Sequence, residues 1–94
     1  MKDLTEIRGE LDQVDREIVH LFEKRMALAA QVAHYKIGAG LPVLDASREE
    51  AVLASRSAML EDPRFTQDVR TLFECLMALS RGEQERIVKE VGTC

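Results

Sequence analysis

The chain has 94 residues, which is the length of one small domain. It is 46% hydrophobic and 32% charged, a composition typical of a folded globular protein and not of a disordered one. The net charge of −4 argues against a general nucleic-acid-binding protein, which would be basic, but it leaves room for a local cationic pocket.

The sequence has no apolar signal region at its N-terminus and no apolar run that approaches the length of a membrane span. Its two cysteines, Cys75 and Cys94, have no neighbour at CxxC spacing, which argues against a zinc or redox motif. One disulfide is conceivable, but Cys94 is the last residue and is expected to fray. We therefore predict two free thiols, a cytoplasmic location, and no metal or cofactor.

The longest predicted helix covers residues 3–37. Its apolar residues recur at intervals of three and four, so they form one stripe along the helix. The stripe comprises Leu4, Ile7, Leu11, Val14, Ile18, Leu21, Leu28 and Val32. A helix of this length is about 52 Å long, whereas a compact domain of 94 residues is only about 32 Å across. A second copy of the chain is the simplest cover for the rest of the stripe.

Two further helices are predicted after this one. The expected elements of the single domain 1–94 are a helix over about 3–37, a loop over 38–44, a second helix over about 46–61 and a third over about 63–89. The second helix starts with either a Ser47–Glu50 capping box or Asp45 as its N-cap. The third starts with Asp62 as N-cap and Pro63 in its first position. The predicted fold is all-α, with one long, one short and one medium-long helix, forming an intertwined homodimer.

Two cations interrupt the apolar face of the first helix. Arg25 lies four residues after Leu21 and three before Leu28, and a charge buried there without a partner would cost several kcal/mol. Lys36 lies about 20° around the helix and about 16 Å along it from Arg25. Together they could hold the two ends of one small anion. The alternatives are that Arg25 pairs with a core carboxylate or snorkels to solvent, and that Lys36 interacts with the helix dipole.

Other polar residues are candidates for the same site. Arg8 lies about 25 Å along the helix from Arg25, so the two cannot share a small ligand within one chain. In an antiparallel dimer, Arg8 can approach the middle of the partner's first helix; otherwise it is solvated. Ser80 and Gln84 continue the apolar stripe of Phe73–Met77, and they need hydrogen-bond partners unless they lie on the surface.

These positions form an ordered set that spans about residues 4–87. The set comprises Ile7-Arg8, Leu11-Asp12, Asp15, Arg25, Lys36, Pro42-Val43-Leu44-Asp45, Arg48-Glu49, Ser80 and Gln84. In this set the chain resembles the all-helical class of chorismate mutases, type II. The resemblance implies an isomerase of phenylalanine and tyrosine biosynthesis, which converts chorismate to prephenate by a pericyclic Claisen rearrangement. Such a reaction needs no nucleophile, proton transfer, metal or cofactor.

The resemblance also implies a role for each carboxylate-binding residue. Arg25 and Arg8 of the partner subunit would clamp the carboxylates of the substrate dianion, and Arg48 and Ser80 would complete these contacts.

The remaining site residues act on the ether oxygen and the ring hydroxyl, by the same resemblance. Lys36 and Gln84 would donate hydrogen bonds to the ether oxygen, where charge develops as the C–O bond breaks. Glu49 would accept a hydrogen bond from the ring hydroxyl, with Asp45 beside it near the loop. Lys36, Gln84 and Arg25 are thus the expected catalytic residues.

Three alternatives stay open at this point. An isochorismate pyruvate lyase has the same fold and binds a related dianion. A non-catalytic helical dimerisation or regulatory module would instead pair Arg25 and Lys36 with carboxylates of its partner. The chain could also be one domain of a fused polypeptide, or associate with another enzyme of the aromatic pathway. No nucleic-acid or membrane partner is expected.

Overall fold

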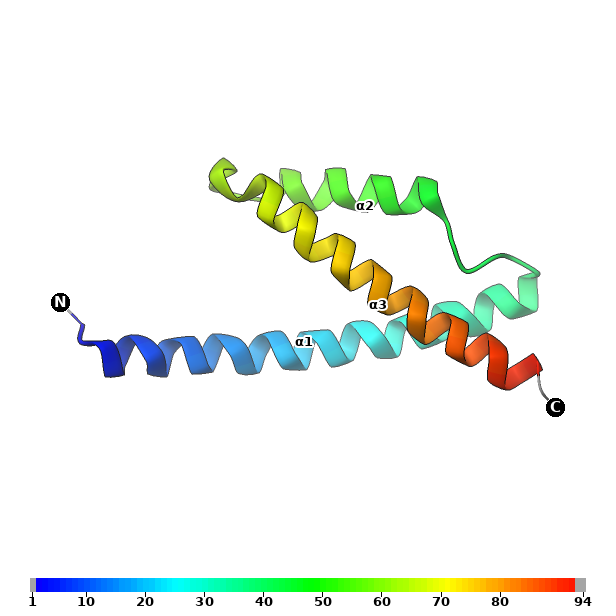
Figure 1. The fold of residues 1–94 in the computed structure, drawn as a ribbon, viewed down its shortest axis with the longest axis horizontal. Coiled ribbons are helices and arrows are strands. Elements are labelled where there is room, and N and C mark those ends of the chain that lie inside the picture. Colours follow the sequence, from blue (N-terminus) through cyan, green and yellow to red (C-terminus); the bar gives the residue numbers. More distant parts are fainter. Residues whose placement is uncertain (1, 93–94) are drawn as a thin grey trace.

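A computed structural model describes residues 2–92 of the chain, and over this range it is helical with no strand. Its elements, labelled in Figure 1, are α1 (Leu4–Ala39), α2 (Ala46–Ala58), a short 3₁₀ helix η1 (Pro63–Phe65) and α3 (Thr66–Gly92). The all-α class with one long, one short and one medium-long helix is thereby confirmed. Cys75 is an exposed free thiol, and Cys94 lies outside the described residues.

The first helix is bounded by a polar cap at one end and a glycine at the other. Asp3 accepts a hydrogen bond of 2.9 Å from the backbone N–H of Glu6, which satisfies one of the free donors of the first turn. Gly40 ends the helix with φ of 68°, a left-handed conformation that glycine adopts without a steric penalty. α1 therefore extends two residues beyond the predicted end near residue 37, because Gly40 and not Gly38 takes the capping conformation.

The bounds of the other two helices also differ from the prediction. Asp45 caps α2 by accepting from the N–H of Arg48 at 3.0 Å, so the Ser47–Glu50 capping box is not used. This helix ends at Ala58 instead of 61, because the chain must become extended at Asp62 before the proline.

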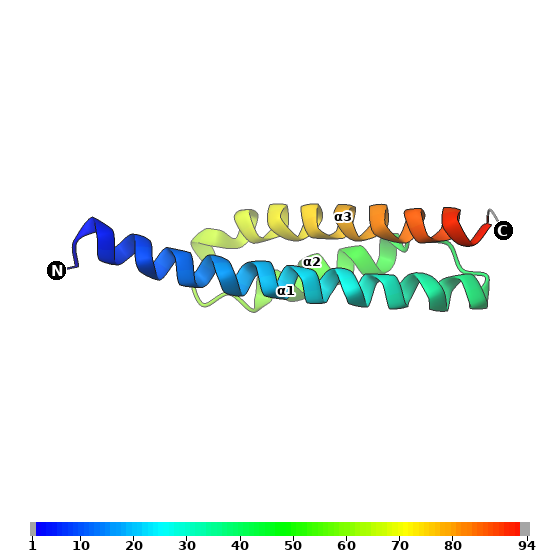
Figure 2. The same ribbon diagram turned by 90° about the horizontal axis from the view of Figure 1, so that it is seen from below.

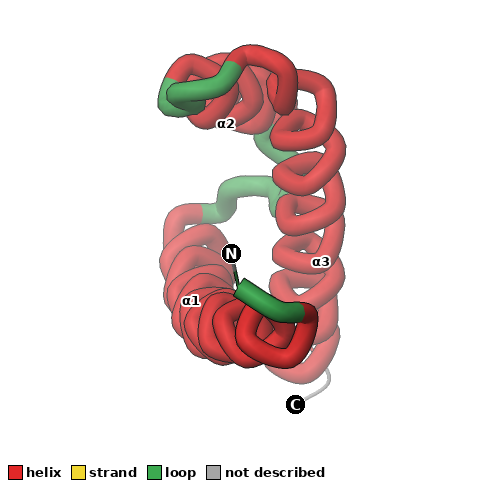
Figure 3. The backbone as a smooth tube through the Cα atoms, turned by 90° about the vertical axis from the view of Figure 1, so that its left-hand side faces the viewer, coloured by secondary structure: helices red, strands yellow, loops and turns green. Residues whose placement is uncertain are grey.

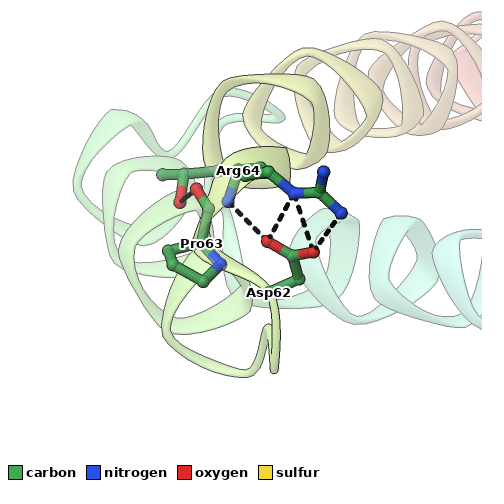
Figure 4. A network of polar contacts seen from close by, with 4 residues as sticks. Asp62, Pro63 and Arg64 are labelled. Atoms are coloured by element: carbon green, nitrogen blue, oxygen red, sulfur yellow. Dashed lines mark hydrogen bonds and ion pairs between the residues drawn. The ribbon is translucent and has the colours of Figure 1, made fainter.

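The predicted start of the third helix at Pro63 is a 3₁₀ turn and not an α-helix. Figure 4 shows that Asp62 caps this turn through the backbone N–H of Arg64 and also pairs with the Arg64 guanidinium. The α-helix proper begins at Thr66 and continues to Gly92, beyond the predicted end at 89.

The third helix joins the other two. In Figure 1 its first turns lie beside α2 and its later turns cross the C-terminal half of α1, while α1 and α2 meet only through α3. The end-on view in Figure 3 shows α3 along one side of both. Figure 2 shows that the N-terminal part of α1 projects past the rest of the molecule. No helix in the described range is long and apolar enough to cross a membrane.

The buried core of this chain is small. Among the described residues the buried hydrophobic side chains are Ala29, Ala33, Val52, Leu53, Met77 and Ile87. The radius of gyration is 17.0 Å, against about 12 Å for a compact domain of this length. The chain exposes 7311 Å² of surface, whereas a compact monomer of 10.6 kDa exposes about 5,500 Å². The fold thus leaves surface uncovered that a monomeric domain would bury.

Much of this uncovered surface lies on the projecting part of α1. Six apolar residues of the predicted stripe are 43–59% exposed there: Leu4, Ile7, Leu11, Val14, Ile18 and Leu21. An apolar stripe this long is typical of a surface that contacts another protein.

Candidate functional site

A pocket of about 320 Å³ lies where α1, α2, α3 and the loop before α2 face one another. Its apolar lining comprises Leu28, Ala29, Val32, Val43, Val52 and Met77, and its polar lining comprises Arg25, Lys36, Asp45, Arg48, Glu49, Arg56, Ser80, Arg81 and Gln84. This volume is within the usual range for small-molecule sites, which are commonly apolar walls carrying a few placed polar groups.

The pocket brings together seven of the eight residues selected from the sequence. They are Arg25, Lys36, Asp45, Arg48, Glu49, Ser80 and Gln84. The eighth, Arg8, is exposed on the projecting part of α1 and does not line the pocket. Within one chain, seventeen residues of helix separate it from Arg25, a distance of about 25 Å.

Helical periodicity explains why each element contributes several groups. On α1, Arg25 and Lys36 lie on the face that also presents Ala29 and Val32. Asp45, the N-cap of α2, precedes a similar face at residues 48, 49, 52 and 56, and α3 supplies residues 77, 80, 81 and 84. Intervals of three and four residues put all members of a set on one side of their helix.

The pocket lining is positively charged, whereas the chain as a whole is negatively charged. Five cations and two carboxylates line it, so its formal charge is +3 in a protein of net charge −4. Burial, together with the nearby guanidinium groups of Arg56 and Arg48, lowers the pKa of Arg25. Within residues 2–92 the guanidinium groups of Arg25 and Arg48 have no carboxylate partner. The alternative that Arg25 pairs with a core carboxylate of its own chain is therefore wrong, and the cluster favours binding of an anion.

Lys36 lines the pocket and is held there by the loop. Its Nζ donates a hydrogen bond of 2.6 Å to the carbonyl oxygen of Val43, and the side chain is partly buried. An ammonium group has three donors, so two remain for a ligand.

Gln84 is the buried polar residue of the site, with 6% of its surface exposed. Its Nε2 donates to Oγ of Ser80 at 3.3 Å, and its buried Oε1 has no partner. A half-turn of the amide exchanges these atoms, so that the Ser80 hydroxyl donates to Oε1 and Nε2 becomes the unpartnered group. In either orientation one amide atom is free for a ligand, since a buried polar atom without a partner is costly.

Two polar residues of the pocket, Arg81 and Arg56, were missed by the sequence analysis. Nη1 of Arg81 contacts both carboxylate oxygens of Glu49, at 2.5 and 2.6 Å, and joins α3 to α2. Arg56 lies seven residues after Glu49 and lines the same wall. Spacing was the signal that could have found them: Arg81 is four residues after Met77, and Arg56 is two helical turns after Glu49.

The polar groups of the pocket suit an organic anion more than a metal or a covalent reaction. Its lining contains no cysteine or histidine, so the Ser80 hydroxyl has no imidazole beside it to act as a base. In the part of the chain that the structure describes, no cluster of three or more His, Cys, Asp or Glu side chains could hold a metal ion. Guanidinium, ammonium and amide donors can orient an anion and stabilise charge that develops on it.

Comparison with known proteins agrees with this chemistry. The model of the family described as chorismate mutase type II matches residues 7–85. The T-protein of Haemophilus influenzae is 38% identical over 69 residues, which cover 73% of this chain and 18% of that protein. The chorismate mutase of Methanocaldococcus jannaschii is 25% identical over 91 residues, covering 96% of this chain and 92% of the relative.

A further relative combines two activities in its name. The bifunctional chorismate mutase/prephenate dehydratase of Aquifex aeolicus is 36% identical over 52 residues, 55% of this chain and 14% of the relative. The chain thus spans less than a fifth of the T-protein and of this bifunctional protein. No solved structure gives a significant match.

Proposed function

Because this chain belongs to the chorismate mutase type II family, we propose that it catalyses the rearrangement of chorismate to prephenate, a step of phenylalanine and tyrosine biosynthesis. The observation that carries the proposal is the pocket of formal charge +3 within an acidic chain. Chorismate is a dianion of small-molecule size, so its two carboxylates match the excess of cations. The cytoplasmic location expected from the sequence stays a prediction.

The reaction needs little chemistry from the protein. One C–O bond breaks while one C–C bond forms within a single molecule, and no proton or external group is transferred. The enzyme must hold the compact reactive conformer of the substrate. The conformational entropy is then lost on binding, and the activation barrier of the reaction is lower. It must also stabilise negative charge that develops on the ether oxygen. Both tasks suit a site made of fixed donors without a nucleophile.

The carboxylate-binding roles fall to the unpaired guanidinium groups. Arg25 and Arg48 have no carboxylate partner within the described chain, so binding a carboxylate would relieve their mutual repulsion. Ser80 supplies a hydroxyl beside them. Arg8 of the partner subunit is the fourth member of this set in our proposal.

Lys36 and Gln84 would act on the ether oxygen. Lys36 is held by its hydrogen bond to Val43, and the buried Gln84 is held by its hydrogen bond with Ser80, so both are positioned before substrate binds. Glu49 would accept from the ring hydroxyl. The carboxylate of Asp45 is occupied by the N–H of Arg48, which supports a role for Asp45 in shaping the loop beside the substrate.

An intertwined homodimer is part of this proposal. The chain exposes about 1,800 Å² more than a compact monomer of its mass, so two copies together carry an excess of about 3,600 Å², which is within the range of about 2,000–5,000 Å² that obligate homodimers bury. The exposed stripe on α1 is the surface available to a second copy. An antiparallel arrangement would bring Arg8 of the partner subunit toward the Arg25 end of the pocket. An isologous interface of this kind creates two equivalent sites.

The test is to offer chorismate to the purified protein and to identify the product. We expect prephenate to form in proportion to enzyme. Arg25→Met should reduce kcat/KM by about 100-fold or more, since a charge-assisted contact to the substrate is lost. The matched control is Arg16→Met on α1, where Arg16 is exposed and, among the described residues, donates a hydrogen bond to Gln13. Absence of prephenate with the folded wild type would overturn the proposal.

The same assay distinguishes the two alternative functions, an isochorismate pyruvate lyase and a non-catalytic module, when isochorismate is offered as well. Pyruvate release from isochorismate, without prephenate formation from chorismate, would indicate the lyase instead. A helical dimer inactive on both substrates would indicate the non-catalytic module. The names of the relatives, which include a chorismate mutase matched over 92% of its length, favour the mutase. Fusion to, or association with, a further enzyme stays open, because three matched relatives are several times longer than this chain.

A further inference from the structure

We propose that Arg81 is a positioning residue of the active site, which holds the Glu49 carboxylate in place for the ring hydroxyl of the substrate. This inference rests on the proposed function and adds to it a residue that neither the sequence pattern nor the expected set of eight includes. Its basis is one contact between α3 and α2 inside the pocket.

The contact has an unusual arrangement. A single terminal nitrogen of Arg81, Nη1, lies between both oxygens of the Glu49 carboxylate, at 2.5 and 2.6 Å. A carboxylate has about four acceptor directions, and this nitrogen uses two of them. The remaining ones are left for a hydroxyl donor. Arg81 therefore orients the carboxylate without closing it to a ligand.

Among the ion pairs of the described residues, this is the one in which both side chains are less than a third exposed. The side chains of Arg81 and Glu49 are 31% and 25% exposed, whereas those of Arg86 and Glu90 are 54% and 64% exposed. Water and salt screen the exposed pair strongly and the pocket pair less. Because the Arg81 pair also joins two helices, its loss would leave Glu49 on α2 without a fixed position.

The pocket needs such a constraint for an electrostatic reason. Glu49 has the cations Arg25, Arg48 and Arg56 around the same cavity, and an unrestrained carboxylate would be drawn toward them. It would then neutralise the groups that a dianion needs. By holding Glu49 from the α3 side, Arg81 keeps this acceptor separate from the cations that bind carboxylates.

The test is a double-mutant cycle on chorismate turnover. Arg81→Met removes the charge while keeping an unbranched apolar stem, and we expect kcat/KM to fall by about 10-fold to 100-fold. In a Glu49→Gln background the same change should cost less than about twofold, because Arg81 acts through Glu49. Arg81→Lys should fall between wild type and Arg81→Met, since a single nitrogen makes the contact.

The matched control is Arg86→Met, an identical change on α3 at an ion pair outside the pocket. Circular dichroism and the melting temperature establish that each variant is folded. Equal activity of the Arg81→Met and Arg86→Met variants would overturn the inference and leave the proposed function intact. An undiminished loss in the Glu49→Gln background would also overturn it, because Arg81 would then contact substrate directly. A wild type without prephenate formation would contradict the proposed function itself.

Discussion

Nζ of Lys36 lies 2.6 Å from the carbonyl oxygen of Val43, so the last turn of α1 is tied to the loop that leads into α2. The contact holds the ammonium group in the lining of the pocket before any ligand binds. It also means that Lys36 has one structural contact and two donors that remain available.

Replacing Lys36 by Met should reduce kcat/KM by about 100-fold or more with little loss of helix content, because the transition-state charge loses a cationic donor. Initial rates of prephenate formation and the far-ultraviolet circular dichroism spectrum measure the two effects. Lys24→Met, on the exposed side of α1, is the matched control and should keep wild-type rates. A Lys36→Met enzyme as active as this control would remove Lys36 from the mechanism.

The role proposed for Gln84 predicts how activity depends on pH. An amide donates a hydrogen bond at any ordinary pH, so the wild type should be active across neutral pH. Gln84→Glu should be nearly inactive at pH 7, because an ionised carboxylate can only accept. Its activity should return as the pH falls toward the ordinary glutamate pKa of about 4.3. The pH profile of kcat/KM tests this, and a profile that stays parallel to the wild type would contradict donation by Gln84.

A shared active site predicts complementation between two inactive variants. Arg8→Met and Arg25→Met should each be inactive alone. In their heterodimer one site carries both defects and the other carries none. Unfolding and refolding an equal mixture should therefore restore about a quarter of wild-type activity, given random pairing into two-fold symmetric dimers. No recovery in a mixture that does form dimers would show that Arg8 and Arg25 do not serve the same site.

Arg56 should increase ligand affinity at the cost of stability. Because it contributes to lowering the pKa of Arg25, the two guanidinium groups repel each other. Arg25 nevertheless stays protonated well above neutral pH, so this cost is constant between pH 5 and pH 9. Arg56→Met should raise the free energy of unfolding by about 0.5 kcal/mol without ligand and raise KM. Thermal melts in increasing salt provide the check, since screening should shrink the stability difference.

Asp62 should make the fold sensitive to acid. Hydrogen bonds from the Arg64 side chain and backbone lower the pKa of this carboxyl (Figure 4). A carboxyl whose pKa is lowered on folding stabilises the protein above its unfolded pKa, about 3.9, and this contribution disappears as the pH falls through the lower folded value. The Asp62→Asn variant should therefore have a slightly lower melting temperature than the wild type at pH 6. This difference in melting temperature should become smaller as the pH is lowered. A difference in melting temperature that does not change with pH would show that Asp62 acts as a helix cap and that its charge contributes no stability.

The sequence was informative wherever a local rule decided the structure. Periodicity located three helices, Asp45 marked the start of α2, and Pro63 marked the 3₁₀ turn that precedes α3, because caps and proline act on their own neighbours. The helix ends were less well predicted. Gly40 and not Gly38 ended α1, since both glycines allow a left-handed conformation and only the whole fold selects one.

For the site, the sequence by itself determined which residues were available and on which helical faces they lie, because a 3.6-residue period fixes the face of each side chain. It could not show that three faces meet in one pocket, because that depends on how α3 crosses the other helices. Only the tertiary structure decided that Arg25 has no carboxylate partner within the described chain. Only the tertiary structure paired Arg81 with Glu49, 32 positions away, because pairing across helices depends on packing and leaves no mark in local spacing.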